Sequence, residues 1–140
     1  MKVLAIDYGA KRVGLAIGDT EVNLALPHGV LELSSAEEVA QKIQDIVDEE
    51  EIEQVIVGEP ITLSGGTSQQ TGVSRAFAKL LTSRLAVPVT LMDERLTSQR
   101  ADAVTFGVRA PTRSRDELAA MFLLQDYLER ARPAEPPASA

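Results

Sequence analysis

The chain has no cysteine and only one histidine among its 140 residues. Without cysteine it can form no disulfide, thiolate nucleophile or cysteine-ligated zinc site. His28 stands in a Pro-His-Gly turn, so we interpret it as a turn residue rather than a general base. One histidine and no cysteine argue against a transition-metal site.

Long apolar runs are also missing. No stretch approaches the roughly 20 residues that span a membrane, and the first apolar run is too short for a signal peptide because it ends at Asp7. We expect a cytoplasmic protein without membrane contact. The length predicts one domain over residues 1–132, and the Pro/Ala-rich residues 133–140 are expected to be a disordered tail.

The net charge of −7 at pH 7 is unevenly distributed. Residues 32–53 contain nine acids and one base, so the remainder of the chain has a net charge of +1. Residues 75–115 contain eight bases and three acids. Both segments can be interpreted as solvated helix faces. The second half of the chain could alternatively present a basic surface.

The first stretch, residues 2–19, is expected to form the centre of the fold. Apolar runs at 3–6 and 13–17 flank a basic turn at 9–12, a pattern typical of a β-hairpin. A wholly apolar strand is usually buried on both faces and central in its sheet. Asp7 stands at the tip of that strand, where a carboxylate is costly to bury unless it is paired or binds a metal.

The rest of the pattern predicts an α/β fold. The expected elements, in order, are an edge strand at 24–33, a helix at 35–51, a strand at 55–57, a loop at 59–72, a helix ending before Pro88, a strand at 87–92, a short helix at 97–104, a loop at 106–113 and a last helix from 114 to about 130. The buried stripe of the first helix should contain Ala36, Val39, Ala40, Ile43, Ile46 and Val47. A three-strand antiparallel meander followed by parallel strands gives a mixed central sheet with helices on both faces.

Open α/β sheets bind ligands at the carboxyl ends of their parallel strands. Those ends carry Asp7, Glu59 and the pair Asp93–Glu94. Acids brought together there repel one another unless a cation lies among them, and Mg²⁺ prefers carboxylate oxygens. Because consecutive strand residues point to opposite faces, at most one of Asp93 and Glu94 should join Asp7.

Each of these acids also has a purely structural interpretation. Asp7 could cap the turn that follows it. Asp93 and Glu94 could be a solvated strand end. Asp116 falls in the first turn of the last helix, where an acid is favoured by the helix dipole.

Four motifs resemble those of the bacterial YqgF, or RuvX, family. They are Asp7–Tyr–Gly–Ala–Lys–Arg–Val–Gly14 with Asp19, Val57–Gly58–x–Pro60 with Gly65, Asp93–Glu94–Arg95–Leu96–Thr97, and Asp116–x–Leu–Ala–Ala120 with Gln125–Asp–Tyr–Leu128. The resemblance covers residues 3 to about 129. It implies an RNase H-like fold, and the family is described as Holliday junction resolvases and pre-16S rRNA nucleases.

The resemblance implies catalytic, metal-binding carboxylates at Asp7, Glu94 and Asp116, with Mg²⁺ or Mn²⁺ as the cofactor. Lys11, Arg12 and Arg95 match the family's basic residues and are expected to bind phosphate, together with Arg109, Arg113 and Arg115 from the basic second half. Position 59 is usually apolar in the family, so Glu59 could be an extra ligand or an unhelpful charge.

Our hypothesis from the sequence is a metal-dependent endonuclease acting on structured RNA, such as pre-rRNA, or on branched DNA. One alternative is a binding module too weak to catalyse; another is a nucleotide phosphotransferase, since Asp-x-Gly with a basic hairpin also resembles actin-like ATPases. Five aromatic residues offer little stacking surface, which favours recognition by shape and phosphate contacts. RNA against DNA, one metal ion against two, and monomer against homodimer stay open.

Overall fold

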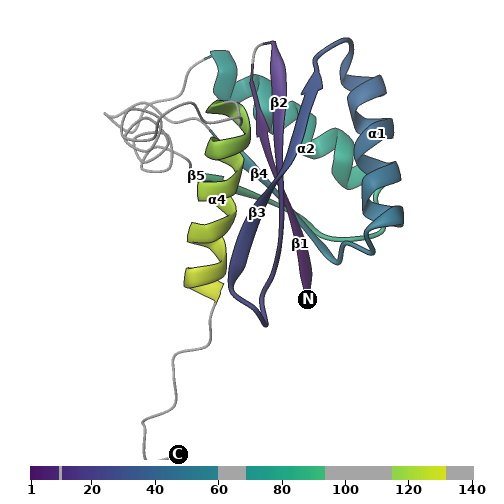
Figure 1. Ribbon diagram of the computed structural model, residues 1–140. Helices are drawn as coiled ribbons and strands as arrows, with labels where there is room; N and C mark the ends of the chain where they lie inside the picture. Colours follow the sequence, from purple (N-terminus) through teal and green to yellow (C-terminus); the bar gives the residue numbers. More distant parts are fainter. Residues whose placement is uncertain (10, 60–68, 94–114, 132–140) are drawn as a thin grey trace, which may run out of the picture.

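The computed structural model describes the backbone of residues 1–9, 11–59, 69–93 and 115–131, and side chains at 1–9, 11–59, 71–92 and 118–130. The chain described there forms a mixed five-stranded sheet between helices (Figure 1). The strands are β1 (Lys2–Tyr8), β2 (Arg12–Asp19), β3 (Leu24–Glu32), β4 (Gln54–Glu59) and β5 (Val89–Asp93). The helices are α1 (Ala36–Glu49), α2 (Gln69–Arg84) and α4 (Arg115–Ala131).

The strand order is β3-β2-β1-β4-β5, which places β1 at the centre and β3 at an edge. β1, β2 and β3 form an antiparallel meander, whereas β1, β4 and β5 run parallel. Both features confirm the sequence prediction. The position of β1 follows from its composition, because residues 3–6 are completely buried and only a central strand is covered on both faces.

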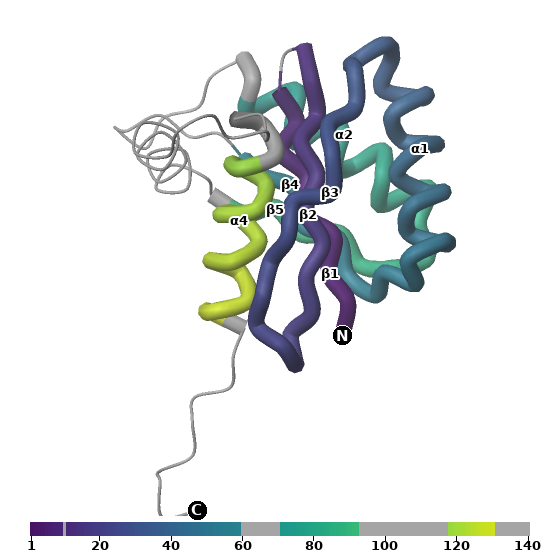
Figure 2. Tube along the Cα trace, viewed as in Figure 1, coloured from purple at the N-terminus to yellow at the C-terminus, as the bar shows by residue number. Residues whose placement is uncertain are grey.

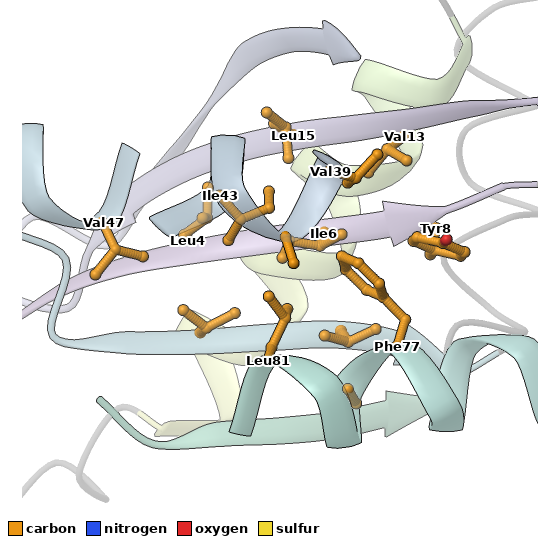
Figure 3. Close-up of a cluster of buried hydrophobic side chains, with 14 of the residues drawn as sticks. Leu4, Ile6, Tyr8, Val13, Leu15, Val39, Ile43, Val47, Phe77 and Leu81 are labelled. Carbon is orange, nitrogen blue, oxygen red and sulfur yellow. The ribbon is translucent and has the colours of Figure 1, made fainter. Parts of the chain in front are cut away.

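The side chains of β1 alternate between the two faces of the sheet and so contribute to two separate hydrophobic cores. Leu4, Ile6 and Tyr8 belong to a cluster with α1 and α2, while Val3 and Ala5 belong to a second cluster with α4. Figure 3 shows the first cluster, with Leu4 and Ile6 facing α1 and α2. Helices therefore cover both faces of the sheet, as predicted (Figure 2).

The first helix begins within one residue of its predicted start at residue 35. Ser35 is its N-cap, and its hydroxyl accepts a hydrogen bond from the Glu38 N–H at 3.1 Å, which satisfies one of the free donors of the first turn. Val39, Ala40, Ile43 and Val47 form the buried stripe. Of the other two residues that we expected in that stripe, Ala36, the first residue of the helix, is exposed and Ile46 is partly buried.

The last helix, α4, packs closely on β2 and β3. A Cβ atom at Gly18 would lie 3.0 Å from Leu128 Cδ1 and 3.1 Å from Leu124 Cδ2, so glycine permits this approach. Gln125 joins α4 to β3 and to the turn before it. Its Oε1 accepts from the Ala25 N–H of β3 at 3.1 Å, and its Nε2 donates to the Asn23 carbonyl at 3.2 Å.

Some predicted boundaries were wrong. The loop expected at 59–72 ends earlier, since α2 begins at Gln69, and β5 begins at Val89 rather than at residue 87. The predicted helix at 97–104, loop at 106–113 and tail at 133–140 lie outside the described residues. Among the described helices, none combines the length and apolar character that a bilayer span requires.

Candidate active site at the carboxyl edge of the sheet

The three parallel strands end together at one edge of the sheet. Ile6 of β1 pairs with Val57 of β4, and Glu59, the last residue of β4, pairs with Asp93, the last residue of β5. Asp7 is one residue beyond Ile6, so the sequence prediction that Asp7, Glu59 and Asp93 share an edge agrees with the observed register. Parallel strands in open α/β sheets present ligand sites at this end.

Asp7 lies on the face of the sheet that α4 covers. Val3 and Ala5 pack in the α4 cluster, and residues two apart on a strand point to the same face. The side chain is partly buried, unlike the four completely buried residues before it. Its carboxylate thus stands where the covered core ends and the sheet edge begins.

The first turn of α4 reaches the same level as Asp7. Leu124 and Leu128 pack at Gly18, and Gly18 pairs with Val3 of β1. Asp116 is eight residues before Leu124, about 12 Å along a helix; Asp7 is four residues after Val3, about 13 Å along a strand. Figures 1 and 2 show α4 running antiparallel to β1, from the level of the β1–β2 turn toward the N-terminus. The backbone thus brings the Asp116 position to the face and the end of the sheet where Asp7 lies.

Glu59 is bound to α2 on the other face. Arg75 donates to it through both Nε, at 2.8 Å from Oε2, and Nη2, at 3.1 Å from Oε1. This two-point geometry is the strong form of a carboxylate–guanidinium pair. The hydrogen bonds to Glu59, and then its charge, raise the pKa of Arg75. Glu59 therefore points away from the face of Asp7, and its charge is balanced.

An aromatic contact fixes α2 beside the end of β1. The rings of Tyr8 and Phe77 stack with centroids 4.1 Å apart and an interplanar angle of 26° (Figure 3). Both side chains are buried, and burial raises the pKa of the Tyr8 phenol. Because Arg75 is two residues before Phe77, the same contact holds the backbone that carries the arginine.

The turn between β1 and β2 adds two cations at this edge. Lys11 and Arg12 are both exposed, and the backbone of the turn is held by two hydrogen bonds. The Gly9 N–H donates to the Arg12 carbonyl at 2.9 Å, and the Leu33 N–H donates to the Lys11 carbonyl at 3.0 Å. The backbone carbonyls of Lys11 and Arg12, which carry the two basic side chains, thus each accept a hydrogen bond.

The densest acidic stretch lies at the opposite edge. Lys2, at the start of β1, donates from Nζ to the Glu50 carbonyl at 3.1 Å, and its ammonium lies 3.7 Å from the Glu50 carboxylate. The acids at 48–51 therefore lie beside the beginning of β1, a full strand length from Asp7.

Several predicted site residues cannot be compared with Asp7 at the level of side chains. Glu94, Arg95, Arg109 and Arg113 lie outside the described residues, and Arg115 and Asp116 are described only as backbone, in α4. Among the side chains that are described, no three acidic or histidine groups cluster closely enough to hold a metal ion. The ligand set Asp7, Glu94 and Asp116 stays a prediction.

Sequence reasoning missed Arg75 as an individual residue. It was counted only among the bases of the second half, because nothing local connects it to an acid 16 residues earlier. One usable signal was Glu59 itself, since a carboxylate at the end of a buried strand needs a partner. The first base of the following helix was the nearest candidate.

Comparison with known sequences identifies close relatives of the chain. A family model described as "RuvX: Holliday junction resolvase" matches residues 1–130. A protein of Maridesulfovibrio salexigens named "Putative pre-16S rRNA nuclease" is 35% identical over 135 residues, covering 94% of this chain and 100% of the relative. A protein of Chloroflexus aurantiacus with the same name is 36% identical over 135 residues, covering 93% of this chain and 88% of the relative.

Comparison with solved structures supports the same fold. RuvC of T. thermophilus in complex with a Holliday junction substrate superposes with a TM-score of 0.62 at 18% identity, covering 94% of this chain and 98% of RuvC. The fowlpox virus Holliday junction resolvase gives a TM-score of 0.60 at 14% identity, covering 93% and 99%. At these identities the likeness shows the fold alone, which is RNase H-like, as the motifs predicted.

Proposed function

Since the chain belongs to the RuvX family of Holliday junction resolvases, we propose that it is a divalent-metal-dependent endonuclease acting on structured nucleic acid. The observation that carries this proposal is the position of Asp7. A partly buried carboxylate lies at the penultimate residue of the central strand, on the face where the first turn of α4 reaches the same level. That is where an oxygen-ligated cation site can form between strand and helix.

The donor set fits a hard cation. The chain offers no cysteine, and carboxylates suit Mg²⁺ or Mn²⁺ better than softer metals. Asp7 and Asp116 would hold the metal, and Glu94 would complete the set if the alternation of β5 continues past its described end, because Met92 packs in the α4 cluster and residues two apart share a face. Glu59, bound to Arg75, is left out of this set.

The bound metal would act as a Lewis acid on the phosphate and lower the pKa of the attacking water. The chain's own residues would bind and orient the substrate. Lys11, Arg12 and Arg95 would hold phosphates near the cleaved bond, and Arg109, Arg113 and Arg115 would follow the backbone. Little covalent work is left for the protein in phosphodiester hydrolysis beyond positioning and charge.

We propose the 5′ end of pre-16S rRNA as the first substrate to test, because two relatives at 35–36% identity are named "Putative pre-16S rRNA nuclease". A four-way DNA junction is the second, because the family model is described as a Holliday junction resolvase. Symmetric junction cleavage requires two active sites, and therefore a homodimer, whereas trimming an RNA end requires one. Processing of rRNA would place the protein in the cytoplasm.

The decisive experiment compares the wild type with Asp7→Asn on both substrates. We expect wild-type cutting with Mg²⁺ or Mn²⁺, none with EDTA, and at least about a hundredfold loss in the variant, a typical scale for removing an electrostatic catalytic group. Circular dichroism and urea unfolding serve as controls for folding. Equal rates in the two proteins would overturn the mechanism, and metal-independent binding without products would indicate a binding module instead.

A further inference from the structure

The pair formed by Glu59 and Arg75 lies at the candidate active edge but on the face opposite Asp7. Val55 and Val57 of β4 pack in the cluster of α1 and α2, so alternation also places Glu59 on that face. A nucleic acid strand crossing the sheet edge would meet Asp7 on one side and this pair on the other. Any phosphate near Arg75 is therefore a flanking phosphate rather than the cleaved one.

The exposure of the two partners differs in a way that favours a ligand for the arginine. The Glu59 side chain is 13% exposed, whereas that of Arg75 is 49% exposed. Glu59 occupies Nε and Nη2 of the guanidinium. A guanidinium carries five N–H donors in a fixed fork, so its outer edge, including Nη1, can still donate to an anion from solvent.

The arginine is held in place at both ends. Its guanidinium is bound by Glu59 at the end of β4. Its helix is fixed by the stacking of Phe77 on Tyr8 and by the completely buried Thr71 and Ser74. An arginine that is already oriented loses less conformational freedom when it binds a phosphate.

We propose that Arg75 is a binding residue for a phosphate flanking the cleavage point, and that Glu59 is the positioning residue that aims it. This inference rests on the proposed nuclease function but names a contact outside the metal site. It also assigns a role to Glu59, which the sequence left between an extra ligand and an unhelpful charge.

The chain provides a matched control in Arg84, nine residues later on the same helix. Its guanidinium donates to Glu37 at 3.2 Å and to Gln41 at 2.6 Å, so it is also paired, but with α1 rather than with the sheet edge. Replacing either arginine removes one charge and one ion pair. Only Arg75 should matter for nucleic acid.

Binding is measured with EDTA present, so that the result is independent of metal and cutting. The probes are a synthetic four-way DNA junction and an RNA carrying the 5′ end of pre-16S rRNA. For Arg75→Gln we expect weaker binding to both and a salt slope smaller by about one, the signature of one lost phosphate contact. Arg84→Gln should retain the wild-type affinity and slope. An unchanged slope in Arg75→Gln would overturn the proposal.

The role of Glu59 is tested by Glu59→Asp, which keeps the charge but shortens the side chain by one methylene. A pure charge effect predicts wild-type KM, whereas a positioning role predicts a several-fold higher KM with unchanged kcat. In the Arg75→Gln background Glu59→Asp should add nothing. A wild-type KM in Glu59→Asp, with folding verified by urea unfolding, would show that Glu59 does not aim the arginine.

The outcome is separable from that of the proposed function. If Asp7→Asn abolishes cutting but Arg75→Gln binds like the wild type, only this inference fails. If Asp7→Asn cuts normally, the nuclease mechanism fails, while the salt slope of Arg75→Gln still reports whether the arginine binds phosphate.

Discussion

Asp7 and Glu59 lie near the same edge of the sheet but have different environments, because side chains along a strand alternate between its two faces. Asp7 shares a face with Val3 and Ala5 and so faces α4, whereas Glu59 faces α2 and is bound by Arg75. Asp7 lies level with residue 58, one residue before Glu59. Because side chains alternate between faces, this difference of one residue decides which helix each acid faces. At the scale of residues, the site is defined by this alternation.

A prediction at this scale concerns Tyr8. Burial raises the pKa of its phenol, so the folded state holds the proton more tightly than the unfolded state, whose phenol titrates near pH 10. The corresponding stability is fully present below about pH 10 and is lost as the pH rises through the folded-state pKa.

Tyr8→Phe removes this titration. We expect its free energy of unfolding, measured in urea, to fall less between pH 8 and pH 10.5 than that of the wild type. Tyr127→Phe, which removes the other phenol on the opposite face of the sheet, is the matched control. Parallel losses in wild type and Tyr8→Phe would contradict the assignment of the alkaline loss to Tyr8.

At the scale of elements, α4 determines whether a second carboxylate can approach Asp7. Its position depends on the Leu124 and Leu128 contacts at Gly18 and on the two hydrogen bonds of Gln125. All of these lie in the half of the helix remote from Asp116. Ala120, in the nearer half, is also completely buried in the α4 cluster, so contacts along the helix place its first turn.

This anchoring predicts the effect of Gln125→Leu. Losing both hydrogen bonds leaves the Ala25 N–H and the Asn23 carbonyl without this partner and should lower the free energy of unfolding by about 1–3 kcal/mol. We also expect slower cutting, because α4 can then shift. Urea unfolding and single-turnover cleavage measure the two effects.

Glu129→Gln, an exposed position near the end of the same helix, is the control and should resemble the wild type in both measurements. If Gln125→Leu matches the wild type in stability and in rate, the two hydrogen bonds do not position α4.

At the scale of the whole molecule, the acids at 48–51 and the basic side chains of the β1–β2 turn lie at opposite ends of β1. The acids at 48–51 lie beside the start of β1, where Lys2 contacts Glu50, while Lys11, Arg12 and Arg75 lie at its carboxyl end. A protein of net charge −7 can therefore present a basic edge to nucleic acid, because exposed charges farther apart than about 8 Å are largely screened at physiological salt.

The location of the charged side chains, rather than the net charge of the protein, should then control its affinity for nucleic acid. Replacing Lys11 and Arg12 with glutamine is expected to weaken junction binding and reduce the salt slope by one to two, about one for each lost phosphate contact. Asp48→Asn with Glu49→Gln changes the net charge by the same amount in the opposite direction, at the far edge. The measurement is affinity against salt concentration in EDTA.

The far-edge variant should bind like the wild type. If it tightens binding as much as the turn variant weakens it, affinity depends on the net charge of the protein and not on where the charges lie.

Periodic and local features were predictable from the sequence by itself. The apolar runs around residues 9–12 determined the hairpin and the central position of β1, and Ser35 with Glu38 marked the start of α1, because each depends on neighbours within a few residues. The absence of cysteine determined that any metal site here would rely on other ligands, chiefly oxygen.

Only the tertiary structure decided which of these residues meet. It placed the Asp116 position level with Asp7 through contacts of Leu124 and Leu128 at Gly18, and it turned Glu59 toward Arg75 on the opposite face. Neither pairing has a local signature, because each joins residues distant in the chain through the packing of a helix on the sheet. Long-range packing, rather than local propensity, therefore set the composition of the candidate site.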